Sequence, residues 1–383
     1  MKRRLLLSSL SSSVLMLSLS AVAAEKIDFE SRYQRPSSDS DEGGLWGYMD
    51  REEDKVKKSP FLIRDAQFKD YLSAIACKLG EAHCPDIRVY PLMVPLFNAN
   101  MAPNGMMQIW SGLMLRVDNE AQLAAVLGHE IGHYLARHSL QRLRDAKSRS
   151  GLGFVTGLFG AVGAIASLGL AAGGFAYSRE HETAADEIGI SLMSKAGFDP
   201  NESAAVWENL QLETKASTEG ESSGFQQLFS THPLPKDRQD NLKRIALLSP
   251  GNIKNEELWQ NKVAPYLRIW LKDEIKRNKF DSTIALLNRL TQREKNKSEY
   301  LFSRGEAFRL RNKGEDFQLA INDYKAAVLW GNEPAEAHKG LGLIYKAKGE
   351  KDLAKASLLT YQAMEPNASD SLLIKSYIEE LES

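Results

Sequence analysis

The chain has 383 residues, of which 43% are hydrophobic and 26% are charged, and this balance is typical of a globular protein. Its length allows two or three domains. The formal net charge of −1 gives no reason to expect nucleic acid or an anionic membrane surface as a partner.

The first segment, residues 1–24, has the pattern of a signal peptide. Residues 2–4 are basic, residues 5–20 are uncharged and rich in leucine, and an Ala-Val-Ala-Ala run offers a cleavage site near Ala23 and Ala24. The stretch is too short and too rich in serine to span a bilayer well. We therefore expect the mature chain to be exported to a bacterial periplasm.

Four short elements are expected before the central helix. Residues 25–60 are polar and predict an N-terminal leader that is extended or partly ordered. Apolar residues at helical spacing predict a helix over 62–82. Residues 86–94 and 106–110 predict two strands, the second preceded by a turn at 103–105.

The two cysteines, Cys77 and Cys84, lie seven residues apart. In an oxidising compartment we favour a structural disulfide that closes a small loop, with two buried free thiols as the alternative. Zinc ligation by the pair is disfavoured, because no second pair of cysteines or histidines follows at zinc-finger spacing.

The next helix carries the strongest motif of the chain. Asp118 or Asn119 is a suitable N-cap, and apolar residues recur at helical spacing from Leu123 to Leu135. Residues 129–133 within it read H-E-x-x-H.

This motif predicts a catalytic zinc site. His129 and His133 are four residues apart and share one helix face, so both imidazoles can meet one Zn²⁺ ion. Glu130 projects beside them and would act as general base on a water that the metal activates. Two surface histidines are the alternative, which the apolar periodicity of the helix disfavours. We expect one Zn²⁺ per chain.

Residues 151–176 are apolar, uncharged and rich in glycine. The stretch is long enough for a transmembrane helix, but its glycines make a continuous helix costly. We favour a helical hairpin or a loop that contacts a membrane surface, and a true span is the alternative.

A third zinc ligand is expected on the helix that follows. A catalytic zinc takes three protein ligands and keeps one open position. Glu182 and Asp186 are i and i+4 on one helix face, so Glu182 can bind zinc while Asp186 hydrogen-bonds a ligating imidazole. His138 and His181 are interpreted as structural.

The C-terminal part predicts tetratricopeptide repeats. Residues 249–252 (Ser-Pro-Gly-Asn) suggest a domain boundary, and the chain beyond it is helical and repetitive. An unrelated helical bundle is the alternative. One unit has the residues that such repeats place where two helices touch, namely Leu341, Gly342, Tyr345, Ala354, Leu358 and Pro366.

The predicted fold is mainly α (α+β). It comprises a signal peptide (1–24), a leader (25–60), an H-E-x-x-H metallopeptidase domain with a small β-sheet (61–249), and a C-terminal α-solenoid of tetratricopeptide repeats (250–383).

Several motifs together resemble one known family. They are H-E-I-G-H at 129–133, E-x-x-A-D at 182–186, the segment 98–113, and Thr-His-Pro at 231–233 with Arg238. The chain resembles the CaaX prenyl proteases and their soluble bacterial relatives, zinc metallopeptidases of the gluzincin type. The order of signal peptide, peptidase domain and repeats is similar to that of periplasmic proteases that assist outer-membrane protein assembly.

The resemblance implies zinc ligation by His129, His133 and Glu182, with Glu130 as general base and acid. It also suggests that residues 106–110 form an edge strand. An extended substrate would then add to Met107, Gln108 and Ile109 by main-chain hydrogen bonds.

His232 is open to three interpretations. It would stabilise the oxyanion of the tetrahedral intermediate, or occupy the open zinc position and keep the enzyme latent, or serve only as a structural turn residue.

We expect an exported zinc endopeptidase that cuts misfolded or stalled envelope proteins. The repeats would bind these substrates or the outer-membrane protein assembly machinery. The alternative is a chaperone-like assembly factor that docks through its repeats, with proteolysis secondary. A membrane-embedded protease, with residues 151–176 crossing the bilayer, is the third possibility.

Overall fold

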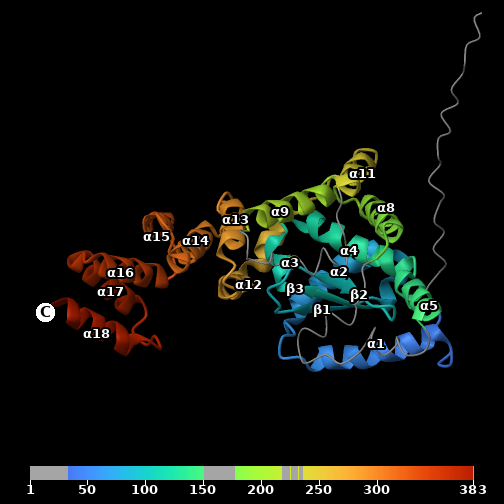
Figure 1. Cartoon of the computed structure of the whole chain (residues 1–383), viewed down its shortest axis with the longest axis horizontal. Coiled ribbons are helices and arrows are strands. Elements are labelled where there is room, and N and C mark those ends of the chain that lie inside the picture. The colour runs from blue at the N-terminus through green and yellow to red at the C-terminus, as the bar shows by residue number, and fades with distance from the viewer. Residues whose placement is uncertain (1–32, 151–176, 218–224, 226–231, 233–235, 383) are drawn as a thin grey trace, which may run out of the picture. The chain divides into compact units, whose positions relative to one another are not determined.

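The computed structural model describes residues 33–150, 177–217, 225, 232 and 236–382 (Figure 1). The elements before residue 151 are α1 (Asp41–Lys58), α2 (Ala66–Gly80), the 3-10 helix η1 (Glu81–Asp86), β1 (Arg88–Leu92), β2 (Ala99–Met101), β3 (Met106–Trp110), α3 (Ser111–Arg116), α4 (Glu120–Leu135) and α5 (His138–Ser150). The later described elements are α8 (Arg179–Lys195), α9 (Glu202–Ala216), α11 (Lys236–Leu247), α12 (Glu256–Lys276), α13 (Phe280–Leu290), α14 (Lys297–Arg311), α15 (Asp316–Trp330), α16 (Glu336–Lys348), α17 (Lys351–Met364) and α18 (Ser371–Glu382).

These elements confirm the predicted class, which is mainly α with a small sheet and a helical C-terminal region. The predicted signal peptide and the apolar segment 151–176 lie outside the described residues. None of the helices within the described ranges combines the length and the apolar character needed to cross a bilayer.

The sheet has the strand order β1-β3-β2, which corrects the prediction that residues 106–110 form an edge strand. β3 pairs with β1 in parallel and with β2 in antiparallel orientation, so Met107, Gln108 and Ile109 lie in the central strand and are buried. The three-residue strand β2 is too short to give a period-two signal in the sequence, and it occupies the side of β3 that was expected to be free.

Part of the leader, which the sequence predicted as extended or partly ordered, is the ordered helix α1. In α1, Leu45, Met49 and Val56 recur at helical spacing and pack in one apolar cluster with Tyr90 and Trp110 of the sheet. Charged residues between these positions make the segment polar on average, and this concealed the helix in the sequence.

Helix α4, which carries the H-E-x-x-H motif, runs through the core. The side chain of Asn119 accepts a hydrogen bond from the backbone N–H of Gln122 at 2.9 Å, which confirms the predicted N-cap. α4 packs against α2, α8, α9 and β2, and nearly all of its residues are buried.

The disulfide is formed between Cys77 and Cys84, at the junction of α2 and η1. It ties the end of α2 to the turn that leads into β1, which is a structural position.

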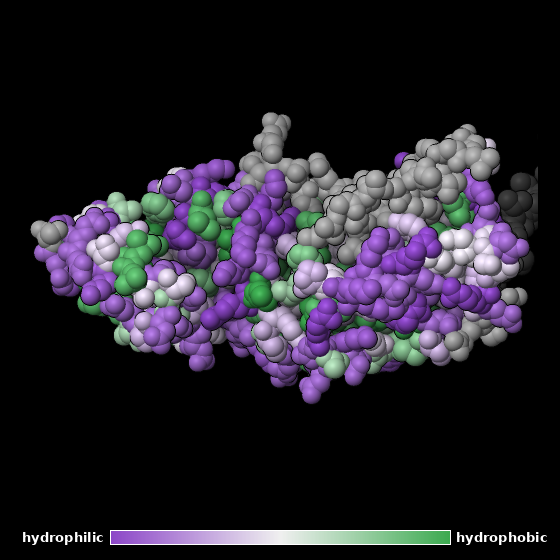
Figure 2. All heavy atoms as spheres, turned by 90° about the horizontal axis from the view of Figure 1, so that it is seen from below, coloured by the Kyte–Doolittle hydropathy of each residue, from purple (hydrophilic) through white to green (hydrophobic). Residues whose placement is uncertain are grey.

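The C-terminal helices pack in consecutive pairs, α14 with α15 and α16 with α17. Small residues lie at their closest contacts: Gly305 faces Tyr324, and Gly342 faces Leu358. These contacts are of the kind that tetratricopeptide repeats require, and the repeat assignment stays a prediction. The face of the molecule in Figure 2 is mainly hydrophilic, with exposed apolar side chains between hydrophilic ones.

Candidate metal centre

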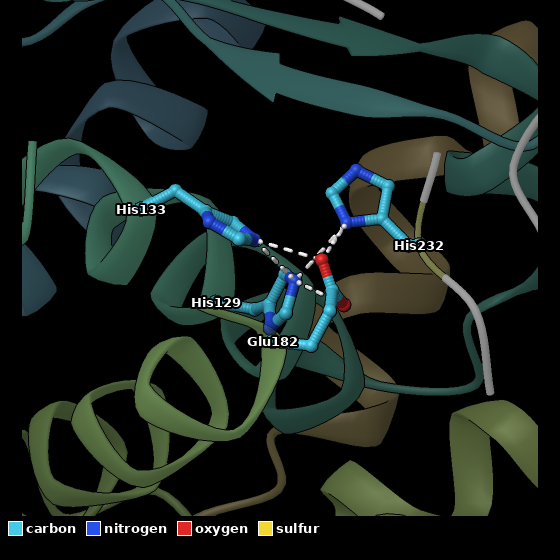
Figure 3. A group of neighbouring side chains, drawn as sticks. All are labelled: His129, His133, Glu182 and His232. Atoms are coloured by element: carbon cyan, nitrogen blue, oxygen red, sulfur yellow. Dashed lines mark hydrogen bonds and ion pairs between the residues drawn. The ribbon is translucent and has the colours of Figure 1, made fainter. Parts of the chain in front are cut away.

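Four buried side chains converge on one point (Figure 3). His129 and His133 come from α4, Glu182 comes from the first turn of α8, and His232 comes from the segment before α11. One ligand atom from each lies within 4.8 Å of the others. The structure therefore brings together the three predicted zinc ligands and the separately predicted His232.

The spacing of the donor atoms fits a small tetrahedral ion. The Nε2 atoms of His129 and His133 are 3.0 Å apart, and His133 Nε2 is 3.3 Å from Glu182 Oε1. His232 Nδ1 is 2.9 Å from Glu182 Oε1 and 3.4 Å from His129 Nε2. Bonds of about 2.0–2.1 Å to zinc would separate neighbouring tetrahedral donors by about 3.3 Å. The donor set, with nitrogen and oxygen atoms only, also suits this metal.

The close approach of α4 and α8 sets these distances. A Cβ atom on Gly132 would lie 2.7 Å from the backbone oxygen of Ala185, and one on Gly189 would lie 2.9 Å from the backbone nitrogen of His129. Only glycine permits this backbone contact. Glu182 lies one helical turn before Ala185, so the contact carries its carboxylate to the histidine face of α4.

A charged pair supports His129. Asp186 Oδ1 is 2.9 Å from His129 Nδ1, and Arg238 holds the same carboxylate through two hydrogen bonds of 2.6 and 2.8 Å. Arg238 also forms an ion pair with Glu182 Oε2. Burial alone would lower the pKa of His129, but the hydrogen bond to Asp186 and the nearby charge of Glu182 raise this pKa above its usual value. This arrangement fits the predicted supporting role of Asp186, which remains a proposal.

His133 is supported by uncharged rings instead. His133 Nδ1 lies 2.8 Å from His138 Nδ1, and the ring of Tyr177 stacks on His133 with centroids 3.9 Å apart. Burial lowers the pKa of His133, and burial with the neighbouring His181 lowers the pKa of His138 to about 4.

Glu130 lies beside the cluster rather than in it. Its carboxylate accepts a hydrogen bond from the backbone of Met101 in β2, and its Oε1 is 4.0 Å from His232 Nε2. Burial raises the pKa of Glu130. The position of Glu130 is suitable for a base that acts on a molecule held at the four-residue centre.

A pocket opens beside the centre, between α4, α8, α9 and α11. The space inside it, together with the open solvent at its mouth, is about 520 Å³. His129, Glu130 and His232 line one side of it. Its remaining wall is mainly apolar and includes Phe97, Val126, Ile190, Met193, Trp207 and Leu242.

Comparison with known proteins gives the family. Residues 63–246 match the model of peptidase family M48. This part of the chain is a peptidase family M48 domain. The four-residue centre lies entirely within it, so the donors belong to a metalloprotease domain.

The curated relatives are metalloendopeptidases and assembly proteases. Mitochondrial metalloendopeptidase OMA1 of Saccharomyces cerevisiae is 37% identical over 150 residues, which are 38% of this chain and 43% of the relative. OMA1 of Schizosaccharomyces pombe is 34% identical over 38% of this chain and 42% of its own length. The beta-barrel assembly-enhancing protease of Escherichia coli O157:H7 is 27% identical over 53% of this chain and 44% of its own length. The chain thus spans less than half the length of these relatives.

Two supporting residues of this M48 domain were not assigned such roles from the sequence. Arg238 was noted in the motif comparison without a role, because its partners lie more than 50 positions earlier in the chain. His138 was interpreted as structural, on the assumption that α4 continues through it. Instead α4 ends at Leu135, and Arg137 adopts a positive φ of 53°, so the chain turns and returns His138 to His133.

Proposed function

We propose that this chain is an exported zinc endopeptidase that acts on misfolded or stalled envelope proteins in outer-membrane protein quality control. The observation that carries the proposal is the convergence of His129, His133 and Glu182 with Glu130 beside them. A purely structural metal site has no use for a buried carboxylate next to its ligands.

In this proposal each residue has a defined role. His129, His133 and Glu182 hold one zinc ion, which supplies Lewis acidity and lowers the pKa of water to about 7 when bound. Glu130 takes the proton of the attacking water and passes it to the leaving amine. Asp186 and Arg238 keep the His129 ring and Glu182 in place.

The substrate would add to β2 rather than to β3. β2 is an outer strand of the described sheet, and the N–H of Met101 points to Glu130 instead of to β3. An extended peptide beside β2 would therefore run past the centre, bound through its main chain. The apolar pocket next to His129 would take one apolar side chain of that peptide.

We further propose that the site is latent in this conformation. In this proposal His232 Nδ1, which lies 2.9 Å from Glu182 Oε1 and 3.4 Å from His129 Nε2, would occupy the position that a catalytic zinc keeps open. An imidazole there would exclude water and substrate. The same contact favours the second candidate function, a chaperone-like assembly factor that docks through its helical repeats and cleaves only when opened.

The cellular setting is supported by two features. Residues 1–24 have the signal-peptide pattern, and the E. coli relative is named for β-barrel assembly. The concave face that tetratricopeptide repeats form would receive unfolded protein or the assembly machinery. Membrane contact through residues 151–176 stays part of the proposal.

A paired experiment tests the activity. The mature chain and Glu130→Gln are purified, zinc is quantified, and both are assayed on an unfolded protein with and without a chelator. We expect one zinc per chain in both, with cleavage only by the wild type and only without chelator. Cleavage by Glu130→Gln at the wild-type rate would reject the assigned base.

Substitution of His232 tests latency. His232→Ala removes the imidazole from the open position, so cleavage should rise while the zinc content stays at one per chain. A sharp fall in cleavage would reject latency and favour a role in stabilising the oxyanion. Zinc without cleavage in every variant would favour the assembly factor.

A further inference from the structure

The two histidines of α4 are supported in different ways. His129 faces the carboxylate of Asp186, which Arg238 clamps. His133 faces His138, a second imidazole, at 2.8 Å between Nδ1 atoms. His138 is only 3% exposed.

The proton positions follow from the geometry. His133 Nε2 points to the donor cluster and needs a free lone pair there, so the ring proton of a neutral His133 lies on Nδ1. The contact at 2.8 Å then has His133 Nδ1–H as donor and His138 Nδ1 as acceptor. His138 consequently carries its own proton on Nε2.

The surroundings hold His138 in this orientation. Its ring stacks on His181 with centroids 4.3 Å apart, and His181 Nε2 is 3.0 Å from Gln141 Oε1. Tyr177 covers the ring of His133. Both rings of the hydrogen bond therefore have a packed neighbour, which limits their rotation.

We propose that His138 is a positioning residue of the metal centre, which fixes the tautomer and ring plane of His133 as its hydrogen-bond acceptor. The proposal rests on the proposed zinc function of the same centre. Partners of metal-bound histidines are usually carboxylates, backbone carbonyls or water, and their loss typically costs about 10–100-fold in metal affinity. A neutral imidazole in this place orients the ligand without adding a further carboxylate to those of Glu130, Glu182 and Asp186.

Two side chains of similar size separate hydrogen bonding from packing. His138→Asn places an amide oxygen near the position of Nδ1 and keeps the acceptor, whereas His138→Leu removes it. His338→Ala is the matched control, because it removes a histidine of α16 whose hydrogen bond is to Glu333 and which is no part of the centre. Zinc affinity of the full mature chain is measured by competition with a chelator at one pH, and thermal unfolding is followed for the metal-free forms.

We expect His138→Leu to bind zinc about 10–100-fold more weakly than the wild type. His138→Asn should recover most of that loss, and His338→Ala should match the wild type. The metal-free Asn and Leu variants should unfold at similar temperatures. If His138→Leu does not fold, His138→Phe replaces it, since Phe keeps the ring without the acceptor.

The outcomes separate this proposal from the proposed function. Wild-type zinc affinity in His138→Leu, or equal losses in the Asn and Leu variants, would overturn the role of His138 while leaving the zinc site intact. Absence of zinc from the wild type itself would overturn the proposed function and this inference with it.

Discussion

The contact between α4 and α8 offers a sharp test of how the centre is built. We predict that Gly132→Ala weakens zinc binding and cleavage although Gly132 has no side chain that could bind the metal. The added Cβ would lie 2.7 Å from the backbone oxygen of Ala185 and 3.0 Å from its Cα. Both are backbone atoms of a packed helix, so they cannot rotate away as a side chain would.

The size of the effect follows from these distances. Ordinary contact begins near 3.4 Å, so the helices must separate by about 0.7 Å. Functional sites tolerate displacements of about 0.5 Å, and a misplacement of about 1 Å can cost ~100-fold in rate. Overpacking costs about 1–3 kcal/mol, of which the better helix propensity of alanine returns up to about 1 kcal/mol.

The assay compares zinc affinity, cleavage rate and urea unfolding of Gly132→Ala with those of Gly44→Ala. Gly44 lies in α1, and its Cβ would meet no atom within 4 Å. Gly44→Ala should therefore keep zinc affinity and gain up to about 1 kcal/mol in stability. If Gly132→Ala retains both zinc affinity and cleavage, the contact of the two helices does not set the ligand geometry.

Two further predictions concern charges that join the peptidase domain to the C-terminal helices. Arg116→Met should lower the free energy of unfolding, measured in urea, by about 3–5 kcal/mol. The reason is that its buried partners Glu213 and Glu274, each 2.8 Å away, would lose their main counter-charge. A loss as small as that of an exposed ion pair, about 1 kcal/mol or less, would contradict this prediction. Burial alone would raise the pKa of Asp118, but Arg289 and Arg293 hold this pKa below its usual value. The ionised Asp118 therefore stabilises the fold above about pH 4, and this stabilisation is lost as the pH falls further. The stability difference between the wild type and Asp118→Asn should therefore be constant near neutral pH and shrink in acid, and a difference that does not change with pH would refute the reasoning.

The parts of the metal centre that could be predicted from the sequence follow from the spacing of residues within one helix. His129 and His133 share a face because any helix places residues i and i+4 together, and the N-cap at Asn119 follows from side-chain chemistry. Glu182 could be named from its own helix and from the family resemblance. Its place opposite α4 depends on a backbone contact at glycines that neither helix encodes alone.

The strand order and the C-terminal end of α4 could not be predicted from the sequence. The edge position given to residues 106–110 was wrong because β2, only three residues long, has too little alternation to be recognised. His138 was misplaced for a similar reason. A periodic pattern gives no signal for a residue such as Arg137, whose positive φ ends one helix and redirects the next.

The two imidazoles of α4 show why the supporting residues matter for the proposed chemistry. Asp186 and Arg238 surround His129 with charge, whereas His138 and Tyr177 surround His133 with neutral rings. Glu182 already contributes a negative charge to the centre, and the carboxylate of Asp186 already bonds His129. A further carboxylate bonded to His133 would make the ligating nitrogen of His133 a stronger donor and weaken the Lewis acidity of a bound metal. A neutral hydrogen-bond partner for His133 therefore favours a bound metal ion that still polarises water. By the same argument, His138→Asp should tighten zinc binding yet slow cleavage, a combination that a purely structural role for His138 would not produce.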